Sequence, residues 1–307
     1  MAEKNKILVH DFLKNGWLDL GCLLDKKKCL SVANKVLKSR PWDKTIFRSY
    51  EDIFNNPRHT NVTPKKNGFN LAESFDLNFI EKNHNLTSCL NKILGKNYEI
   101  ILKKFVVSAP NQIIPNWLKP IIEKKLDGNL AQYIKPEFRN ISYFSGIDYH
   151  MDLLDYANFD GDYLTIYVYL TDVNSNQSPL NIIDKSHIYG ATHFPHYLKK
   201  TKQTSKLLYS KDGKNYQKFD KKKLISDKGS VYLWSALTIH GTIKSSSKKP
   251  RVALRYSIRK KKNSNSKTLI DKLYDNLKIR LDHKTRTDIV SKGSSTVKHK
   301  NIKRFLT

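Results

Sequence analysis

Tyr149-His150-Met151-Asp152 is the stretch from which the fold and the candidate chemistry of this chain can be worked out. Side chains two positions apart leave a strand on the same face, so His150 and Asp152 can bind one metal ion together. His240 offers a third ligand at the end of the apolar run that begins at Trp234. Two imidazoles and one carboxylate leave adjacent positions open on a six-coordinate ion, which suits non-haem Fe(II) chemistry. We therefore predict that these three side chains bind a metal ion.

The His-x-Asp pattern alone is weak, because a surface or capping pair is its ordinary interpretation. A nearby arginine strengthens it. Arg251 follows His240 by eleven residues and opens a segment of alternating residues that ends at Arg259. Alternation places Arg251 and Arg255 on one face of that strand. A guanidinium is a bidentate receptor for a carboxylate, so Arg251 indicates a cosubstrate with one carboxylate at the metal and another at the arginine.

Several segments around these residues follow one another in a definite order. They are Tyr149–Asp152, Leu164–Val173, Ser178–His187, and Gly229–Trp234 leading into His240-Gly241-Thr242 and Arg251. In this order they resemble the phytanoyl-CoA dioxygenase-like family of Fe(II)/2-oxoglutarate-dependent oxygenases. The resemblance covers roughly residues 140–259 and is loose outside them.

The resemblance implies a cosubstrate site and a reaction. Fe(II) would be bound by the three predicted metal ligands, and 2-oxoglutarate by Arg251 with help from Thr242. Tyr167 stands where the family often carries a tryptophan near the cosubstrate, and we predict it as a further cosubstrate-binding residue. With O2 as the other reactant, the implied reaction is hydroxylation of a small-molecule substrate with release of succinate and CO2.

The strand pattern predicts a fold that is mainly β with flanking helices. Tyr98–Ser108 is rich in β-branched residues, and Tyr163–Leu170 alternates between apolar residues and a face of three tyrosines and one threonine. We interpret the tyrosine face as the lining of a barrel. Metal ligands on two strands far apart in sequence then favour a double-stranded β-helix, the cupin-like jelly roll of about eight antiparallel strands.

The domain organisation that we predict is one oxygenase domain followed by an appendage. The domain spans residues 1–259, with a helical N-terminal part over 1–95 and a jelly-roll core over 96–259. Residues 260–307 are predicted to form a basic C-terminal helix and tail, because an amphipathic stretch there follows a hydrophilic linker.

Three expectations concern single segments of the core. Residues 188–223 form a long polar insertion, which we interpret as a mobile loop over the substrate. Lys103 or Lys104 is a candidate to point inward, toward a carboxylate of the cosubstrate. His187 follows a predicted strand, and we expect it to be structural.

The composition is strongly basic, with 56 Lys and Arg against 28 Asp and Glu and a net charge of +28. Such a charge can attract nucleic acid, anionic membranes or acidic metabolites. The excess is mainly lysine spread over a chain rich in Asn and Ile, which favours composition bias over a polyanionic partner. No apolar run is long enough to span a membrane and no secretory signal is present, so a cytoplasmic location is expected. The three cysteines have no Cys-x-x-Cys spacing and indicate neither a disulfide framework nor a zinc site.

Other functions stay open at the level of sequence. A non-catalytic cupin-like metal-binding module would have no use for Arg251 at its spacing. A nucleic-acid-directed oxygenase would use the positive charge, but no aromatic base-flipping signature is visible. Iron-dependent halogenation needs an open coordination position where Asp152 stands. We therefore favour a small-molecule substrate, with an anionic compound as one option.

Overall fold

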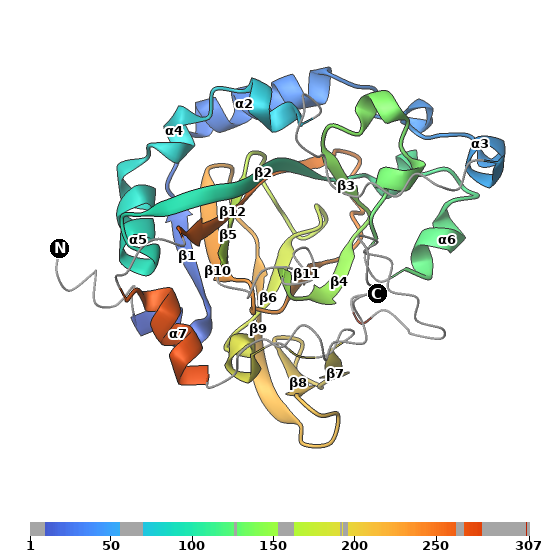
Figure 1. Ribbon diagram of the computed structural model, residues 1–307. Coiled ribbons are helices and arrows are strands. Elements are labelled where there is room, and N and C mark those ends of the chain that lie inside the picture. Colours follow the sequence, from blue (N-terminus) through green and yellow to red (C-terminus); the bar gives the residue numbers. More distant parts are fainter. Residues whose placement is uncertain are drawn as a thin grey trace.

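Two sheets curl toward each other and enclose the interior of a barrel (Figure 1). The computed structural model describes residues 10–55, 70–125, 128–152, 163–190, 192, 196–261, 267–277 and 305. The arrangement is a jelly roll, which confirms the predicted fold class. In Figure 1, α2 and α4 lie along the outer side of one sheet, and the strands β7, β8 and β9 project from the opposite end of the molecule.

The sheet beside the helices, called here the major sheet, has six strands in the order β1-β10-β5-β12-β2-β3. Its strands are β1 (Trp17–Cys22), β2 (Tyr98–Ser108), β3 (Ser142–Phe144), β5 (Tyr163–Tyr169), β10 (Ser230–Ser235) and β12 (Arg251–Lys260). All neighbours are antiparallel except β2 and β3, which run parallel.

Strand alternation gives the major sheet two different faces. Val252 and Leu254 of β12 belong to the core shared with the helices. Ala253 packs inside the barrel with the tyrosines of β5. Arg251 and Arg255 have the same parity as Ala253 and so share its interior face, as the sequence predicts.

The second sheet, called here the minor sheet, has the order β4-β11-β6-β9-β8-β7. Its strands are β4 (Ile147–His150), β6 (Leu180–Ile183), β7 (Tyr197–Lys200), β8 (Lys206–Ser210), β9 (Gln217–Leu224) and β11 (His240–Thr242). The neighbours are all antiparallel. Its shortest strand, β11, lies beside the edge strand β4.

Helices cover the outer face of the major sheet. In α2, Cys29, Val32, Ala33 and Val36 recur at helical spacing and are buried, and the Asp25 side chain accepts a hydrogen bond from the Lys28 amide (2.8 Å) as its N-cap. The α-helices are α2 (Lys26–Lys38), α3 (Tyr50–Asn55), α4 (Asn78–Glu81), α5 (His84–Leu94), α6 (Lys119–Glu123) and α7 (Leu269–Leu277). The 3-10 turns are η1 (Lys44–Ile46), η2 (Leu71–Ser74), η3 (Asn111–Ile113), η4 (Ala131–Tyr133), η5 (Pro136–Phe138) and η7 (Ser186–Tyr189). Among the described residues, every helix is too short or too polar to pass through a bilayer.

The expectation that residues 188–223 form a loop is wrong. Strands β7, β8 and β9 lie in this segment and extend the minor sheet. Only isolated apolar residues, such as Leu207 and Phe219, are buried on its inner side, and lysines fill most of the other strand positions. We call residues 197–224 the lysine-rich arm. Only β9 pairs with β6, while β8 pairs with β9 and β7 with β8. Sequence periodicity does not reveal this pairing.

Two elements connect the parts of the chain outside the predicted jelly-roll core to that core. Strand β1 pairs with β10 and forms the edge of the major sheet. Helix α7 lies against α5, and its Ile270 and Leu273 are buried in the core beneath the helices. The jelly roll therefore uses a strand from the first 95 residues of the sequence, and a helix beyond residue 259 packs on the same core.

Candidate metal centre and cosubstrate site

The three predicted metal ligands lie together at the edge where β4 meets β11. His150 ends β4, His240 begins β11, and the two are paired across the strands. Their ring centroids are 4.4 Å apart. Asp152 follows two residues after His150, and one ligand atom from each of the three side chains lies within 4.8 Å of the others. No other group of this kind occurs among the residues that the structure describes.

Backbone carbonyls hold both imidazoles in one tautomer. Nδ1 of His150 lies 2.9 Å from the Asp148 carbonyl oxygen, and Nδ1 of His240 lies 3.0 Å from the Thr238 carbonyl oxygen. A carbonyl oxygen can only accept a hydrogen bond, so each Nδ1 carries the proton. The lone pair of each neutral ring is therefore on Nε2, which is the form in which histidine binds metals.

Other side chains orient the Asp152 carboxylate. Its Oδ2 accepts hydrogen bonds from Trp234 Nε1 (2.8 Å) and from the Thr165 hydroxyl. Its Oδ1 lies 3.4 Å from His240 Nε2 and 2.8 Å from Arg255 Nη2. One oxygen is thus fixed by the major sheet, and the other points toward the imidazoles.

The charges around Asp152 keep it ionised. Burial alone would raise the pKa of this carboxyl, but the guanidinium of Arg255 holds the pKa well below its usual range. An ionised carboxylate is the state that a cation requires. The site is therefore prepared for a metal in both geometry and charge.

Arg251 is buried nearby on the interior face of β12, with only 2% of its surface exposed. Its Nη2 donates to the Tyr167 hydroxyl (2.9 Å), and its Nη1 donates to the Ser178 carbonyl. Burial raises the pKa of Tyr167, so this phenol stays neutral and can accept the bond. Within the described residues, neither Arg251 Nε nor the hydroxyl of Ser108, which faces it across the strands, has a hydrogen-bond partner.

The structure also places the remaining predicted residues. Thr242 lies on β11 two positions beyond His240, and its hydroxyl accepts the Ile147 amide (3.1 Å), which links β11 to β4. Lys104 is 3% exposed and lies on the same face of β2 as Val106, which packs inside the barrel. Lys103 lies on the outer side, where its Nζ is 3.4 Å from Glu81 of α4. Lys104 is thus the lysine that points inward.

His187 is not one of the three candidate metal ligands that lie together, in agreement with its predicted structural role. Its Nε2 donates to the Leu13 carbonyl (3.1 Å), and burial lowers the pKa of the ring to about 4.

Sequence reasoning missed the residues that support the site. Trp234 and Thr165 lie in segments that the sequence singled out, but their bonds to Asp152 depend on how β10 and β5 pair. Ser108 gives no signal in the sequence beyond its place at the end of a predicted strand.

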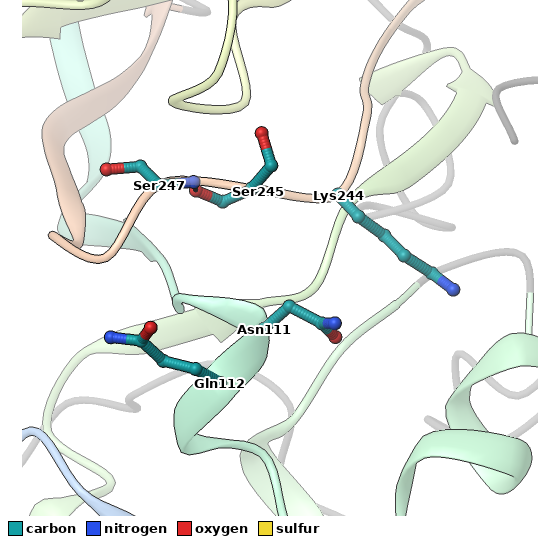
Figure 2. Close-up of a pocket in the computed structure, with 6 residues that line it drawn as sticks. Asn111, Gln112, Lys244, Ser245 and Ser247 are labelled. Carbon is teal, nitrogen blue, oxygen red and sulfur yellow. Dashed lines mark hydrogen bonds between the residues drawn. The ribbon is translucent and has the colours of Figure 1, made fainter.

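An open hollow lies elsewhere on the molecule and contains none of the predicted site residues (Figure 2). It has a volume of about 380 Å³ and lies between Asn111 and Gln112 of η3 and the connection from Lys244 to Ser247. Lys244, its one charged side chain, forms an ion pair with Glu123 (2.9 Å). At the candidate metal centre, by contrast, Asp152 and His240 are buried and His150 is partly buried.

Comparison of the sequence with known proteins gives no relative. No protein-family model matches it, and no curated protein matches it.

Comparison of the structure with solved structures does give similar proteins. SnoN, a non-haem α-ketoglutarate-dependent epimerase from nogalamycin biosynthesis, has a TM-score of 0.50 at 11% identity, over 85% of this chain and 84% of that chain. SnoN in complex with Fe³⁺, α-ketoglutarate and nogalamycin RO gives a TM-score of 0.50 at 12% identity, over 85% of each chain. At this identity the likeness concerns the fold, so this chain has the jelly-roll fold of SnoN.

Proposed function

We propose that this protein is an Fe(II)- and 2-oxoglutarate-dependent oxygenase that hydroxylates a small molecule. The observation that carries the proposal is the donor set at the edge of β4 and β11. Two imidazoles are fixed in the metal-binding tautomer beside one ionised carboxylate. Such a set fits Fe(II) and leaves coordination positions for a cosubstrate and dioxygen.

Arg251 also supports the binding of 2-oxoglutarate. Arg251 is buried on the interior face, and its Nε is a donor without a partner among the described residues. A buried guanidinium that still has a donor to satisfy is suited to a carboxylate. Thr242, on the strand of His240, would assist it, as the family resemblance implies.

The protein side chains have separate tasks in this proposal. When bound, Fe(II) and 2-oxoglutarate supply the activation of dioxygen, and oxidation of the cosubstrate to succinate and CO2 accompanies hydroxylation. His150, Asp152 and His240 hold the ion, while Trp234 and Thr165 fix the carboxylate rotamer. Burial of Asp152 and His240 keeps water from these two side chains and so strengthens their interactions.

The likeness to SnoN supports an α-ketoglutarate-dependent enzyme, but it does not support hydroxylation in particular. SnoN shares the fold and is an α-ketoglutarate-dependent enzyme, but it is an epimerase. Hydroxylation is therefore proposed from the family resemblance, and the substrate must be found by experiment.

Succinate release tests the proposal directly. The protein, Fe(II) and 2-oxoglutarate are incubated with fractionated metabolite pools, and succinate is measured. We expect His240→Ala and Asp152→Ala to abolish both Fe(II) binding and succinate release. His84→Ala, which removes an exposed histidine on α5, serves as the control. Full retention of metal binding in His240→Ala would show that the triad is wrong.

A second variant tests the anchoring arginine. Arg251→Ala should raise the apparent KM for 2-oxoglutarate by one to two orders of magnitude, roughly 1.5–3 kcal/mol for a lost charge-assisted pair. Arg259→Ala is the matched control, because Arg259 lies on the same strand but pairs with Glu99 (2.6 Å) at its partly exposed end. Arg255 is unsuitable as a control, since it contacts the metal ligand Asp152. Equal KM values for Arg251→Ala and the wild type would place the anchor elsewhere.

A further inference from the structure

Ser108 is a buried serine that the proposed mechanism has not used. It ends β2 and is paired with Arg251 across the β2–β12 register. Directly opposed residues of antiparallel strands have Cβ atoms about 4.5–5.5 Å apart, so the two side chains reach the same part of the interior face. Ser108 is only 1% exposed, which keeps its hydroxyl away from bulk water.

Ser108 and Arg251 each carry a buried polar atom without a hydrogen bond in the described part of the chain. Within the described residues, the Ser108 hydroxyl and Arg251 Nε have no hydrogen-bond partner. Buried polar groups are nearly always bonded, so an unbonded pair needs an explanation. Arg251 Nε–H can only donate, and the serine hydroxyl can donate as well. Two converging donors match a ligand with two acceptor oxygens.

The hydrogen bonds of the other Arg251 nitrogens show which nitrogen remains for a ligand. Its Nη1 already donates to the Ser178 carbonyl, and its Nη2 donates to the Tyr167 hydroxyl. Those bonds fix the plane of the guanidinium and leave Nε as the nitrogen without a partner. Ser108 is the serine that lies opposite this arginine in the sheet.

We propose that Ser108 is a cosubstrate-binding residue whose hydroxyl, together with Arg251 Nε–H, binds the distal carboxylate of 2-oxoglutarate. The inference rests on the proposed function and adds a residue that neither the motif spacing nor the family resemblance indicated. It makes β2, which carries no metal ligand, part of the cosubstrate site.

Two other serines provide matched controls. The hydroxyls of Ser142 on β3 and Ser257 on β12 are also buried without a partner among the described residues. Ser142 is paired with Val106, and Ser257 with Leu102 and Thr165, so neither faces Arg251. Replacing them removes the same group from the same barrel at a different position.

The test is calorimetric titration of 2-oxoglutarate into protein loaded with Ni(II), which requires no turnover. Ser108→Ala should raise the Kd about tenfold or more, the effect of losing a hydrogen bond to a charged group. Ser108→Thr keeps the hydroxyl and should restore binding close to the wild-type value. Ser142→Ala and Ser257→Ala should bind 2-oxoglutarate as the wild type does.

Pyruvate separates a direct contact from a structural effect, because it has the keto-acid end of 2-oxoglutarate but no distal carboxylate. Ser108→Ala should bind pyruvate as the wild type does. In an Arg251→Ala background, Ser108→Ala should add little further loss, since the two residues share one ligand group. Weakened pyruvate binding, or an equal loss in Ser142→Ala, would overturn the assignment.

The outcomes also distinguish this inference from the proposal on which it rests. If the Ni(II)-loaded wild type does not bind 2-oxoglutarate, the proposed function fails. If the wild type binds it and Ser108→Ala binds equally well, only the role of Ser108 fails.

Discussion

Trp234 is one of the side chains through which the major sheet holds the carboxylate of Asp152, the proposed metal ligand. Its indole donates to Asp152 Oδ2 at 2.8 Å, and its ring lies 4.7 Å from that of His240, centroid to centroid. One residue thus positions two proposed ligands, the carboxylate by a hydrogen bond and the imidazole by packing. The outer groups around a metal site commonly matter almost as much as the ligands themselves.

We predict that Trp234→Phe weakens Fe(II) or Co(II) binding about 10- to 100-fold, because the carboxylate loses a donor while most of the ring packing remains. Metal titration measures the effect. Trp42→Phe is the control, since the Trp42 indole donates to the Leu37 carbonyl (2.8 Å) in the helical layer. Equal metal affinity in both variants would show that Trp234 only fills space.

His187 makes stability depend on pH. Burial lowers the pKa of its ring to about 4, below the value of about 6.5 for an unfolded chain. Between these values the unfolded chain binds more protons than the folded one, so the contribution of His187 is present above pH 6.5 and is lost as the pH falls toward 4. The loss should be roughly 3 kcal/mol.

Chemical denaturation at a series of pH values measures this contribution. We expect His187→Gln, which keeps an amide donor for the Leu13 carbonyl, to show a flatter decline in the free energy of unfolding between pH 6.5 and 4. His84→Gln should follow the wild type, because His84 is exposed. Parallel curves for His187→Gln and the wild type would contradict the prediction.

Among the elements, the lysine-rich arm depends on its turn. The Asp212 side chain accepts the amides of Lys214 and Asn215 between β8 and β9. Gly213 has a φ of +76°, and a Cβ there would lie 3.1 Å from the Tyr197 ring. Both the backbone conformation and the space at this position favour glycine.

Gly213→Ala should therefore loosen the arm without unfolding the barrel. Amide hydrogen exchange should speed up in β8 and β9 and stay unchanged in β5 and β12. Gly213→Asn, which tolerates positive φ better, should have the smaller effect. Faster exchange throughout the barrel would mean that the arm and the barrel unfold as one unit.

Strands with dense alternation could be predicted from the sequence, whereas strands that depend on their neighbours could not. Tyr163–Tyr169 and Tyr98–Ser108 carry apolar or aromatic residues at most positions. Strand β9 has only two buried residues, Phe219 and Leu224, and its lysines look like loop sequence. The pairing of β1 with β10 likewise becomes visible only in the fold.

The residues of the candidate site also include some that the sequence predicts and one that it does not. His150, Asp152, His240 and Arg251 could be predicted, because each chemistry needs particular residue types at particular spacings. Ser108 could not, because serine is common and its significance comes from lying opposite Arg251. Its proposed role depends on the register of the sheet, which a single sequence does not reveal.

For the whole molecule, the contact between β4 and β11 affects how the protein resists a pulling force. The two strands are four and three residues long, so few backbone hydrogen bonds join them. An ion shared by Asp152 and His240 would tie together points far apart along the chain. When the termini are pulled, the chain between Asp152 and His240 could not extend until the bonds to the ion broke. Fully extended, this segment would be on the order of 300 Å long. Pulling on the two termini with optical tweezers should show this delayed lengthening with Fe(II) or Ni(II) present, and early lengthening once a chelator is added.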